Sequence, residues 1–137
     1  MEIVSLIHVV PPELSQLDPI HRDARGIIVS ILNTPISNVS IIESCKGTFR
    51  SNHYHKTDWH VMYTLTGAYN YYARRVGDQS ALQCRRINKG ETLFTGVMEE
   101  HLCEFLEDTT LLVLSKNPRD QASYESDVVR LDLISEI

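Results

Sequence analysis

Short segments rich in β-branched and aromatic residues make up most of this 137-residue chain, and turn residues separate them. Such segments favour β-strands because their side chains pack well on a pleated surface. We predict ten strands: Ile3–Val9, Gly26–Leu32, Val39–Cys45, Thr48–His53, Trp59–Thr66, Ala68–Arg75, Leu82–Ile87, Thr92–Phe94, Glu100–Leu106 and Thr110–Ser115. This succession of short strands predicts an all-β sandwich or barrel.

Helical signals are few. Pro12–Leu17 suits one turn, and Ser123–Leu133 suits either a short amphipathic tail or a last strand. A chain of this length forms one domain, residues 1–137, that buries roughly 70% of its unfolded surface. Closure of the strands into a jelly-roll barrel would limit exposed edges and leave room inside for a small ligand.

Four of the six histidines form one arrangement: His53 and His55 two apart, His60 five further on, and His101 in a later segment. Residues two apart on a strand point to the same face, so one ion can lie between His53 and His55. Strand parity also places His60 and His101 on inward faces. The four histidines therefore predict a metal site inside the barrel.

Glycines bracket the first three histidines, with Gly47 six positions before His53 and Gly67 seven after His60. This segment resembles the first motif of the cupin superfamily: Gly, five residues, His-x-His, three or four residues, Glu, six residues, Gly. His60 stands at the glutamate position. The resemblance implies a cupin double-stranded β-helix, with the first motif at residues 47–67.

The second cupin motif is matched in part, at residues 90–105. Gly90 and His101 match its outer landmarks. Gly96, Met98 and Phe105 stand where the motif usually has Pro, Gly and Asn.

Imidazole ligands limit the metal to Zn, Fe, Ni or Cu, because Mg and Ca prefer oxygen ligands. With His60 in place of a carboxylate, the divalent site would carry charge +2, which favours an anionic substrate or an added water or hydroxide. His60 either completes the ligand set or orients another ligand.

Two further stretches are similar to small cupins of nucleotide-sugar and surface-polysaccharide biosynthesis. One is Arg50-Ser-Asn-His-Tyr-His-Lys56, where the group has Gly at Ser51. The other is Ser115-Lys-Asn-Pro-Arg119, followed by Tyr124-Glu-Ser-Asp127 and Arg130, and His21–Gly26 resembles the entry of deoxysugar epimerases and ketoisomerases.

The closer resemblance implies a homodimer that epimerises or ketoisomerises a nucleotide-linked 4-keto sugar. It assigns the base to His53 and the acid to an inward tyrosine, for which Tyr69 and Tyr71 are the best placed. The planar guanidinium of Arg50 suits a phosphate at the barrel mouth. Two alternatives stay open: an Fe(II)-dependent cupin dioxygenase, and a non-enzymatic module that binds a small ligand.

Composition excludes several other classes. The net charge of −5 disfavours nucleic acid and anionic membranes as partners. No apolar run approaches the roughly 20 residues of a membrane-spanning helix. Three scattered cysteines and a start without signal-peptide features predict a reduced, cytoplasmic protein.

Overall fold

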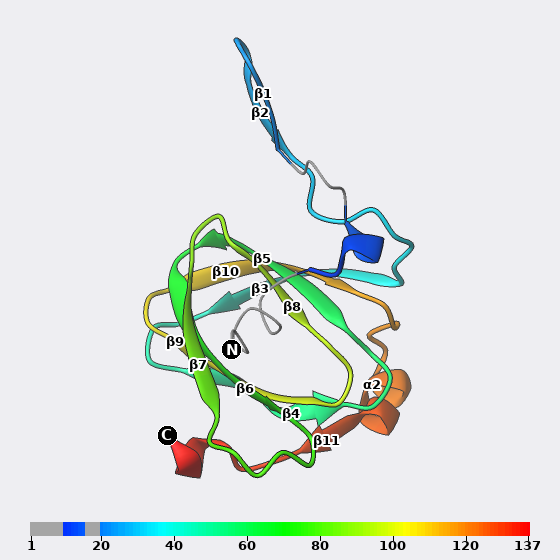
Figure 1. Cartoon of the computed structure of the whole chain (residues 1–137), viewed down its shortest axis with the longest axis vertical. Helices are drawn as coiled ribbons and strands as arrows, with labels where there is room; N and C mark the ends of the chain where they lie inside the picture. The colour runs from blue at the N-terminus through cyan, green and yellow to red at the C-terminus, as the bar shows by residue number, and fades with distance from the viewer. Residues whose placement is uncertain (1–9, 16–19) are drawn as a thin grey trace.

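The computed structural model describes residues 10–15 and 20–137. Two antiparallel sheets face each other (Figure 1), one with the strand order β3-β10-β5-β8 and the other β11-β4-β9-β6-β7. The strands of the first sheet are β3 (Asn38–Ser44), β10 (Thr109–Ser115), β5 (His60–Thr66) and β8 (Thr92–Thr95). Those of the second are β11 (Val128–Arg130), β4 (Phe49–His55), β9 (Glu99–Phe105), β6 (Ala68–Arg75) and β7 (Gln83–Asn88).

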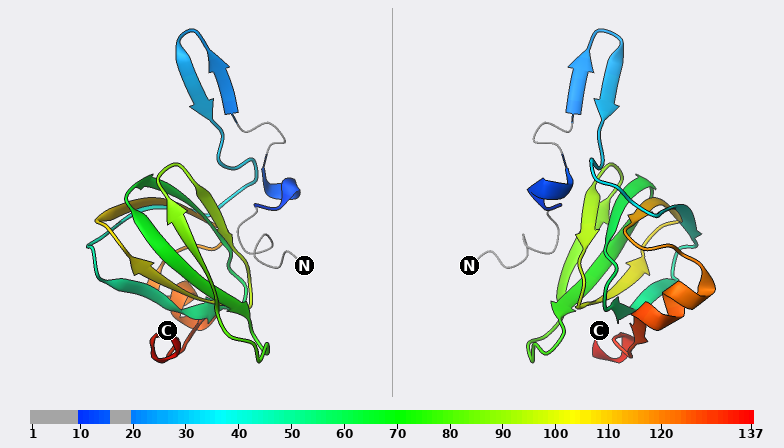
Figure 2. Two further views of the ribbon diagram at one scale, coloured as in Figure 1. Left: turned by 60° about the vertical axis from the view of Figure 1, so that its left-hand side comes forward. Right: turned by 90° about the vertical axis from the view of Figure 1, so that its right-hand side faces the viewer.

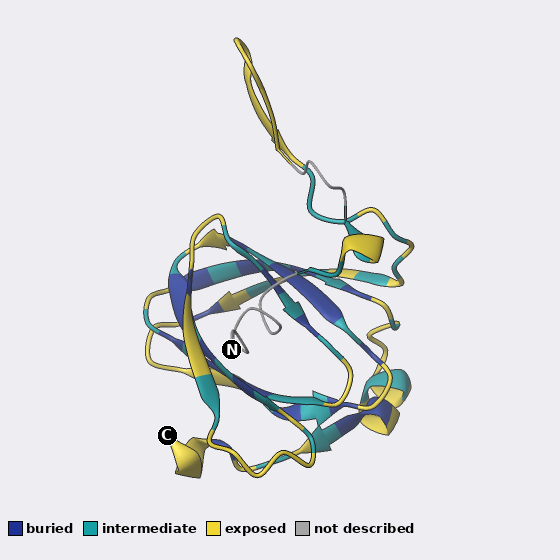
Figure 3. Ribbon diagram, in the orientation of Figure 1, coloured by how far each residue is buried: buried dark blue, intermediate teal, exposed yellow. Residues whose placement is uncertain are grey.

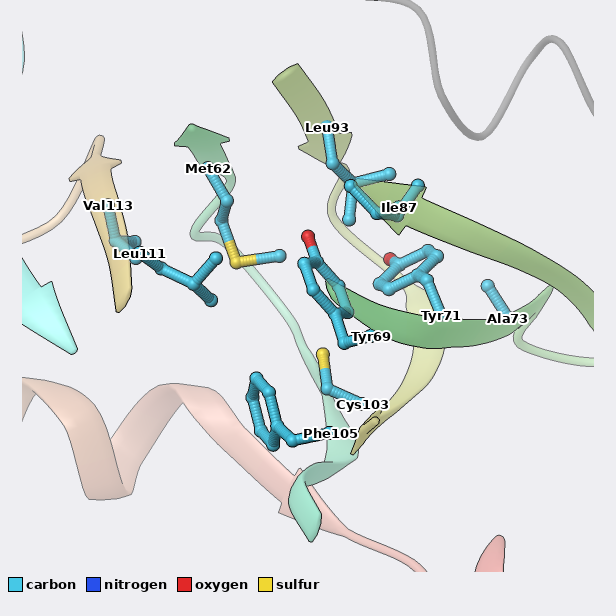
Figure 4. Packing of buried hydrophobic residues seen from close by; sticks show 10 residues of the cluster. All are labelled: Met62, Tyr69, Tyr71, Ala73, Ile87, Leu93, Cys103, Phe105, Leu111 and Val113. Atoms are coloured by element: carbon cyan, nitrogen blue, oxygen red, sulfur yellow. The ribbon is translucent and has the colours of Figure 1, made fainter. Parts of the chain in front are cut away.

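The core lies between the two sheets (Figure 3), where alternate residues of each strand meet. On β5 the inward face carries His60, Met62 and Thr64, and on β9 it carries His101 and Cys103. Figure 4 shows the side chains of the apolar cluster pointing into one space: Met62, Tyr69, Tyr71, Ala73, Ile87, Leu93, Cys103, Phe105, Leu111 and Val113.

A hairpin of β1 (Ile20–Asp23) and β2 (Gly26–Val29) extends away from the barrel (Figure 2). All eight of its strand residues are exposed, including Ile27 and Ile28. The short 3-10 helix η1 (Pro12–Leu14) precedes it.

The C-terminal segment contains the α-helix α2 (Gln121–Asp127), the strand β11 and the 3-10 helix η2 (Ile134–Glu136). The side chain of Asp120 caps α2 by accepting a hydrogen bond from the Ser123 backbone N–H. β11 pairs with β4, and Asn52 accepts hydrogen bonds from the backbone N–H groups of Leu131 and Leu133. The segment is therefore fastened to the strand that carries His53 and His55.

The all-β prediction is confirmed, and eight of the predicted strands that fall on described residues match observed strands to within two residues at each end. The prediction for Ala68–Arg75 is correct at both ends. Gly26–Leu32 starts as predicted but ends at Val29. Ile3–Val9 lies outside the described residues. The predicted turn at Pro12–Leu17 is the shorter helix η1, and Ser123–Leu133 contains parts of both a helix and a strand. Strand β1 was not predicted.

Within the described residues, no helix is long and apolar enough to cross a membrane.

Ser51 and Met98 have a left-handed backbone at positions where the cupin sequence patterns have glycine. Ser51 has φ 73° and Met98 has φ 55°. Glycine adopts this conformation without a Cβ clash. Met98 is also 41% exposed, so little packing compensates.

We expect Met98→Gly to raise the free energy of unfolding by about 1 kcal/mol, because it relieves the left-handed strain. The exposed neighbour Val97 is not among the positive-φ residues, so Val97→Gly should destabilise the protein. Urea denaturation measures both changes. Destabilisation by Met98→Gly equal to that of Val97→Gly would contradict the strain argument.

Candidate metal centre and its cavity

The fold brings the four predicted histidines together at one end of the core. His53 and His55 end β4, His60 begins β5, and His101 lies on β9 as the register partner of His53. All four are buried, between 1% and 8% exposed. A register shift between Ser51 and His53 re-aims the end of β4. The parity prediction that these side chains face the barrel interior is therefore confirmed.

The ring nitrogens are close enough for a metal. One nitrogen each from His53, His55 and His101 lie within 4.8 Å of one another. His60 joins the group through His55, because the two Nε2 atoms are 3.1 Å apart. Ligands at roughly 2.1 Å from a tetrahedral zinc would be about 3.4 Å apart, so this spacing suits two ligands of one ion. A second set, His55, Asp58 and His60, meets the same distance limit.

Hydrogen bonds orient three of the rings. His55 Nδ1 lies 2.7 Å from Asp127 Oδ2, and His101 Nδ1 lies 2.8 Å from the backbone oxygen of Glu99. A backbone oxygen and an ionised carboxylate can accept a hydrogen bond but cannot donate one. Each Nδ1 therefore carries the proton, and each Nε2 keeps its lone pair. His60 Nδ1 lies 2.8 Å from Ser115 Oγ, which can donate or accept. His55 and His101 therefore keep on Nε2 the lone pair that a metal would bind, and in the metal-free protein that of His55 faces His60 Nε2 at 3.1 Å.

Asp127 also anchors the loop after β4. Its Oδ1 accepts hydrogen bonds from the backbone N–H and hydroxyl of Thr57, and from the backbone N–H of Asp58. Burial raises the pKa of Asp127, but the hydrogen bonds from Thr57 and His55 outweigh it and lower that pKa below its ordinary value. The carboxylate is thus the ionised acceptor that the His55 tautomer requires. Burial raises the pKa of Asp58.

His53, His60 and His101 are held neutral. Burial, reinforced by the neighbouring histidines, lowers the pKa of His53 to about 2. Burial also lowers the pKa of His101 to about 4 and that of His60 well below its ordinary value. Neutral imidazoles are the form that binds metals. The donor set fits a divalent transition metal, and its nitrogen chemistry argues against Mg or Ca.

The pKa shifts predict a pH-dependent stability for metal-free protein. Below about pH 6.5 an unfolded chain protonates these histidines and the folded chain does not, so stability falls as pH falls. Burial raises the pKa of Glu99 to about 7. Between pH 4.5 and 7 the folded chain therefore keeps a proton on Glu99 that the unfolded chain releases, so this group makes stability fall as pH rises. Because the three histidines outweigh the one glutamate, the free energy of unfolding should rise as pH rises from about 4.5 to 6.5.

Urea midpoints across this range measure the effect, and Glu99→Gln should steepen the rise by removing the opposing group. A profile that is flat for the wild type and for Glu99→Gln would contradict the assignment.

Tyr69 and Tyr71 lie within the apolar core (Figure 4). The hydroxyl of Tyr71 donates to Glu99 Oε2 at 2.6 Å and is 2.9 Å from Thr95 Oγ1. Its ring stacks on His101 with centroids 6.0 Å apart. Burial raises the pKa of both tyrosines well above the ordinary value. Neither lines the cavity beside the histidines, although Tyr71 packs on His101, which does.

The histidines open into a cavity of about 130 Å³. Its rim carries two arginines from distant parts of the chain, Arg50 and Arg119, together with Tyr124 of α2. Arg50 donates to Ser44 Oγ at 2.7 Å and to the backbone oxygen of Glu43 at 3.1 Å. These bonds fix its guanidinium beside the cavity, and its predicted contact with a phosphate stays a prediction. The remaining lining residues are Ile42, Ser51, His53, His55, His60, Met62, His101 and Val113.

Sequence reasoning had not assigned site roles to Asp58, Arg119, Tyr124 or Asp127. Asp127 is 72 residues from the histidine that it contacts. Arg119, Tyr124 and Asp127 do fall in the C-terminal stretch that resembles other cupins, and that resemblance was the available signal. The side-chain contacts themselves depend on the path of α2, which the sequence left undecided between helix and strand.

No protein-family model and no curated protein sequence matches the chain. Solved structures do match. QdtA, a sugar 3,4-ketoisomerase from Thermoanaerobacterium thermosaccharolyticum in complex with TDP, has a TM-score of 0.66 and 22% identity over 85% of this chain and 88% of that one. ChmJ, a 3'-monoepimerase from Streptomyces bikiniensis in complex with dTDP-quinovose, has a TM-score of 0.63 and 18% identity over 76% of this chain and 63% of that one.

The capsular polysaccharide assembling protein CapF from Staphylococcus aureus has a TM-score of 0.61 and 24% identity over 82% of this chain. The chain spans only 33% of the length of CapF. These likenesses confirm the fold predicted from the two motifs: the chain folds as a cupin-type jelly-roll barrel.

Proposed function

We propose that this protein is a metal-binding cupin that moves a proton beside the ketone of a nucleotide-linked sugar, as an isomerase or epimerase does. The observation that carries the proposal is the buried histidine cluster, which opens into a cavity with two arginines at its rim. Structures with the same fold include QdtA in complex with TDP-4-keto-6-deoxyglucose and ChmJ in complex with dTDP-quinovose. Histidine nitrogens suit proton transfer, and arginines suit a diphosphate.

The proposed metal ligands are His53, His55 and His101, completed by His60. A bound divalent cation would stabilise negative charge on the ketone oxygen when the neighbouring proton leaves. A nitrogen that binds a metal cannot accept a proton, so His53 is the base only when it is not a ligand. Tyr124 then becomes the candidate for proton transfer, because it lines the cavity, whereas the predicted Tyr69 and Tyr71 do not.

Deuterium incorporation tests this function. The protein in D₂O, with TDP- or UDP-linked 4-keto sugars, should introduce deuterium on the carbon beside the ketone. Metal-free and metal-loaded protein should be compared, with Tyr124→Phe, His53→Asn and His21→Asn, an exposed control on β1. No exchange in either form, together with oxygen uptake on a small chelating substrate with Fe(II), would replace the proposal by the dioxygenase alternative. Tight metal without either activity would favour a binding module.

We also propose a homodimer. β3 is an edge strand of its sheet, and it exposes Val39 and Ile41 at 57% and 59%. The β1–β2 hairpin exposes Ile28 at 64%. A two-stranded hairpin is marginally stable alone, and exposed apolar residues on an edge strand favour association with another chain. A second copy offers both surfaces at once, in the reciprocal manner of a two-fold dimer.

Ile28→Asp combined with Ile41→Asp should convert the dimer into a monomer, because both charges would be buried at the contact. Val97→Asp, at an apolar residue that is 42% exposed in the turn after β8, is the control. Analytical ultracentrifugation measures the mass. A wild-type protein that is a monomer at every concentration would refute this part of the proposal.

A further inference from the structure

We infer that a second hollow next to the histidine cavity binds the nucleoside of a nucleoside diphosphate, with Arg119 holding the phosphates between the two. This inference rests on the proposed function and adds the position of the nucleotide. The hollow has a volume of about 270 Å³ and is lined by Arg119, Gln121, Tyr124 and Glu125. Arg119 and Tyr124 also line the histidine cavity, so they form the partition between the two spaces.

The size of the inner cavity requires an outer site. About 130 Å³ is well below the range of roughly 300–1,000 Å³ that drug-sized ligands fill, so only part of a nucleotide sugar can enter. The sugar belongs beside the histidines because its reacting carbon must reach them. The nucleoside must then lie outside the histidine cavity. The hollow that adjoins this cavity at Arg119 is the neighbouring space for it.

The charges at the rim indicate an anion. Several arginines of the described residues pair with carboxylates, as Arg74 does with Glu100 and Glu136, and Arg130 with Glu125. Across the described residues, neither Arg50 nor Arg119 has a carboxylate within ion-pair distance. Two arginines without counter-ions at one cavity, in a chain of net charge −5, mark the place where an anion supplies the missing charge.

Arg119 is also held in position. Its Cζ lies 5.3 Å from the centre of the Tyr124 ring, a cation–π contact that leaves the N–H edges of the guanidinium for phosphate oxygens. The one carboxylate in the outer hollow, Glu125, is engaged by two hydrogen bonds from Arg130 at 2.8 and 2.9 Å. This pairing reduces its repulsion of a phosphate. The amide of Gln121 can both donate to and accept from a base.

Calorimetric titration of the purified protein with TDP, UDP and inorganic pyrophosphate tests the inference. Arg119→Gln should weaken binding of TDP or UDP by about 10- to 100-fold, the effect of losing a charge-assisted hydrogen bond. The control Arg86→Gln removes an arginine that is exposed on β7, so it should leave the affinity unchanged. Both nucleotides should also bind more tightly than pyrophosphate, because the outer hollow holds the nucleoside.

The inference would be overturned if Arg119→Gln and the wild type bound TDP and UDP with equal affinity. It would also be overturned if the wild type bound these nucleotides no more tightly than pyrophosphate. The deuterium-exchange result separates it from the proposed function. Exchange with an unchanged KM in Arg119→Gln keeps the function and rejects the outer site. Nucleotide binding that depends on Arg119, without exchange on any keto sugar, keeps the outer site and rejects the function.

Discussion

Replacing His55 by alanine should lower the affinity of the protein for zinc by more than about a hundredfold. Loss of a residue that only hydrogen-bonds a metal ligand lowers metal affinity by about 10- to 100-fold, and loss of a ligand should exceed this. His55 is the central ring of the cluster. Its Nε2 lies 3.1 Å from that of His60, and it belongs to both groups of potential ligands. Its lone pair faces the other nitrogens because Asp127 accepts the proton on Nδ1. The wild type should bind about one divalent transition metal per chain.

Competition against a chromogenic chelator measures the affinity, and elemental analysis of untagged protein gives the stoichiometry. His21→Ala is the matched control, because His21 is an exposed histidine on β1. The affinity should also fall as the pH approaches about 4, the pKa to which burial lowers His101, since the ligands must be neutral. Metal-free native protein whose zinc affinity is the same with His55→Ala would rule out the centre.

His60 is tested separately because it stands at the carboxylate position of the cupin motif. His60→Glu should keep tight binding and lower the charge of the site by one, whereas His60→Ala should weaken it. If His60→Ala binds zinc as tightly as wild type, His60 only orients other residues. Its contact with Ser115 would then be its structural role.

Strand parity made much of the site predictable from the sequence. His60 on β5 and His101 on β9 face inward because every second residue of a strand points to the same side. The same rule placed Tyr69 and Tyr71 inward, and both are indeed buried. Parity gives a direction but no depth, so it could not show that the rings of these tyrosines end in the core instead of the cavity.

Other parts of the site depend on contacts between distant segments. The register shift at Asn52 requires two successive residues with positive φ, and only the asparagine favours that conformation. Asp127 and Tyr124 reach the histidines because α2 ends where β11 pairs with β4. In the sequence this stretch suits a helix or a strand equally, so no local pattern could aim its side chains.

Asp127→Asn should lower the zinc affinity by about 10- to 100-fold, although Asp127 is not one of the potential metal ligands His53, His55 and His101. The carboxylate accepts the Nδ1 proton of His55 at 2.7 Å, which leaves the lone pair on Nε2. An asparagine that keeps its oxygen toward the Thr57 N–H turns its NH₂ group toward His55. Since two donors cannot face each other, His55 would then move its proton to Nε2 and lose the ligand lone pair on the side of the cluster.

Two measurements distinguish this positioning role from a loss of folding. Nitrogen NMR of metal-free protein should show His55 protonated on Nδ1 in the wild type and on Nε2 in Asp127→Asn. The control Asp120→Asn makes the same change in the same segment, where asparagine still caps α2, and should leave both the tautomer and the zinc affinity unchanged. An unchanged tautomer with weaker zinc binding would mean that the negative charge of Asp127 acts directly on the ion. An unchanged affinity would show that the carboxylate serves only to fasten the C-terminal segment to Thr57.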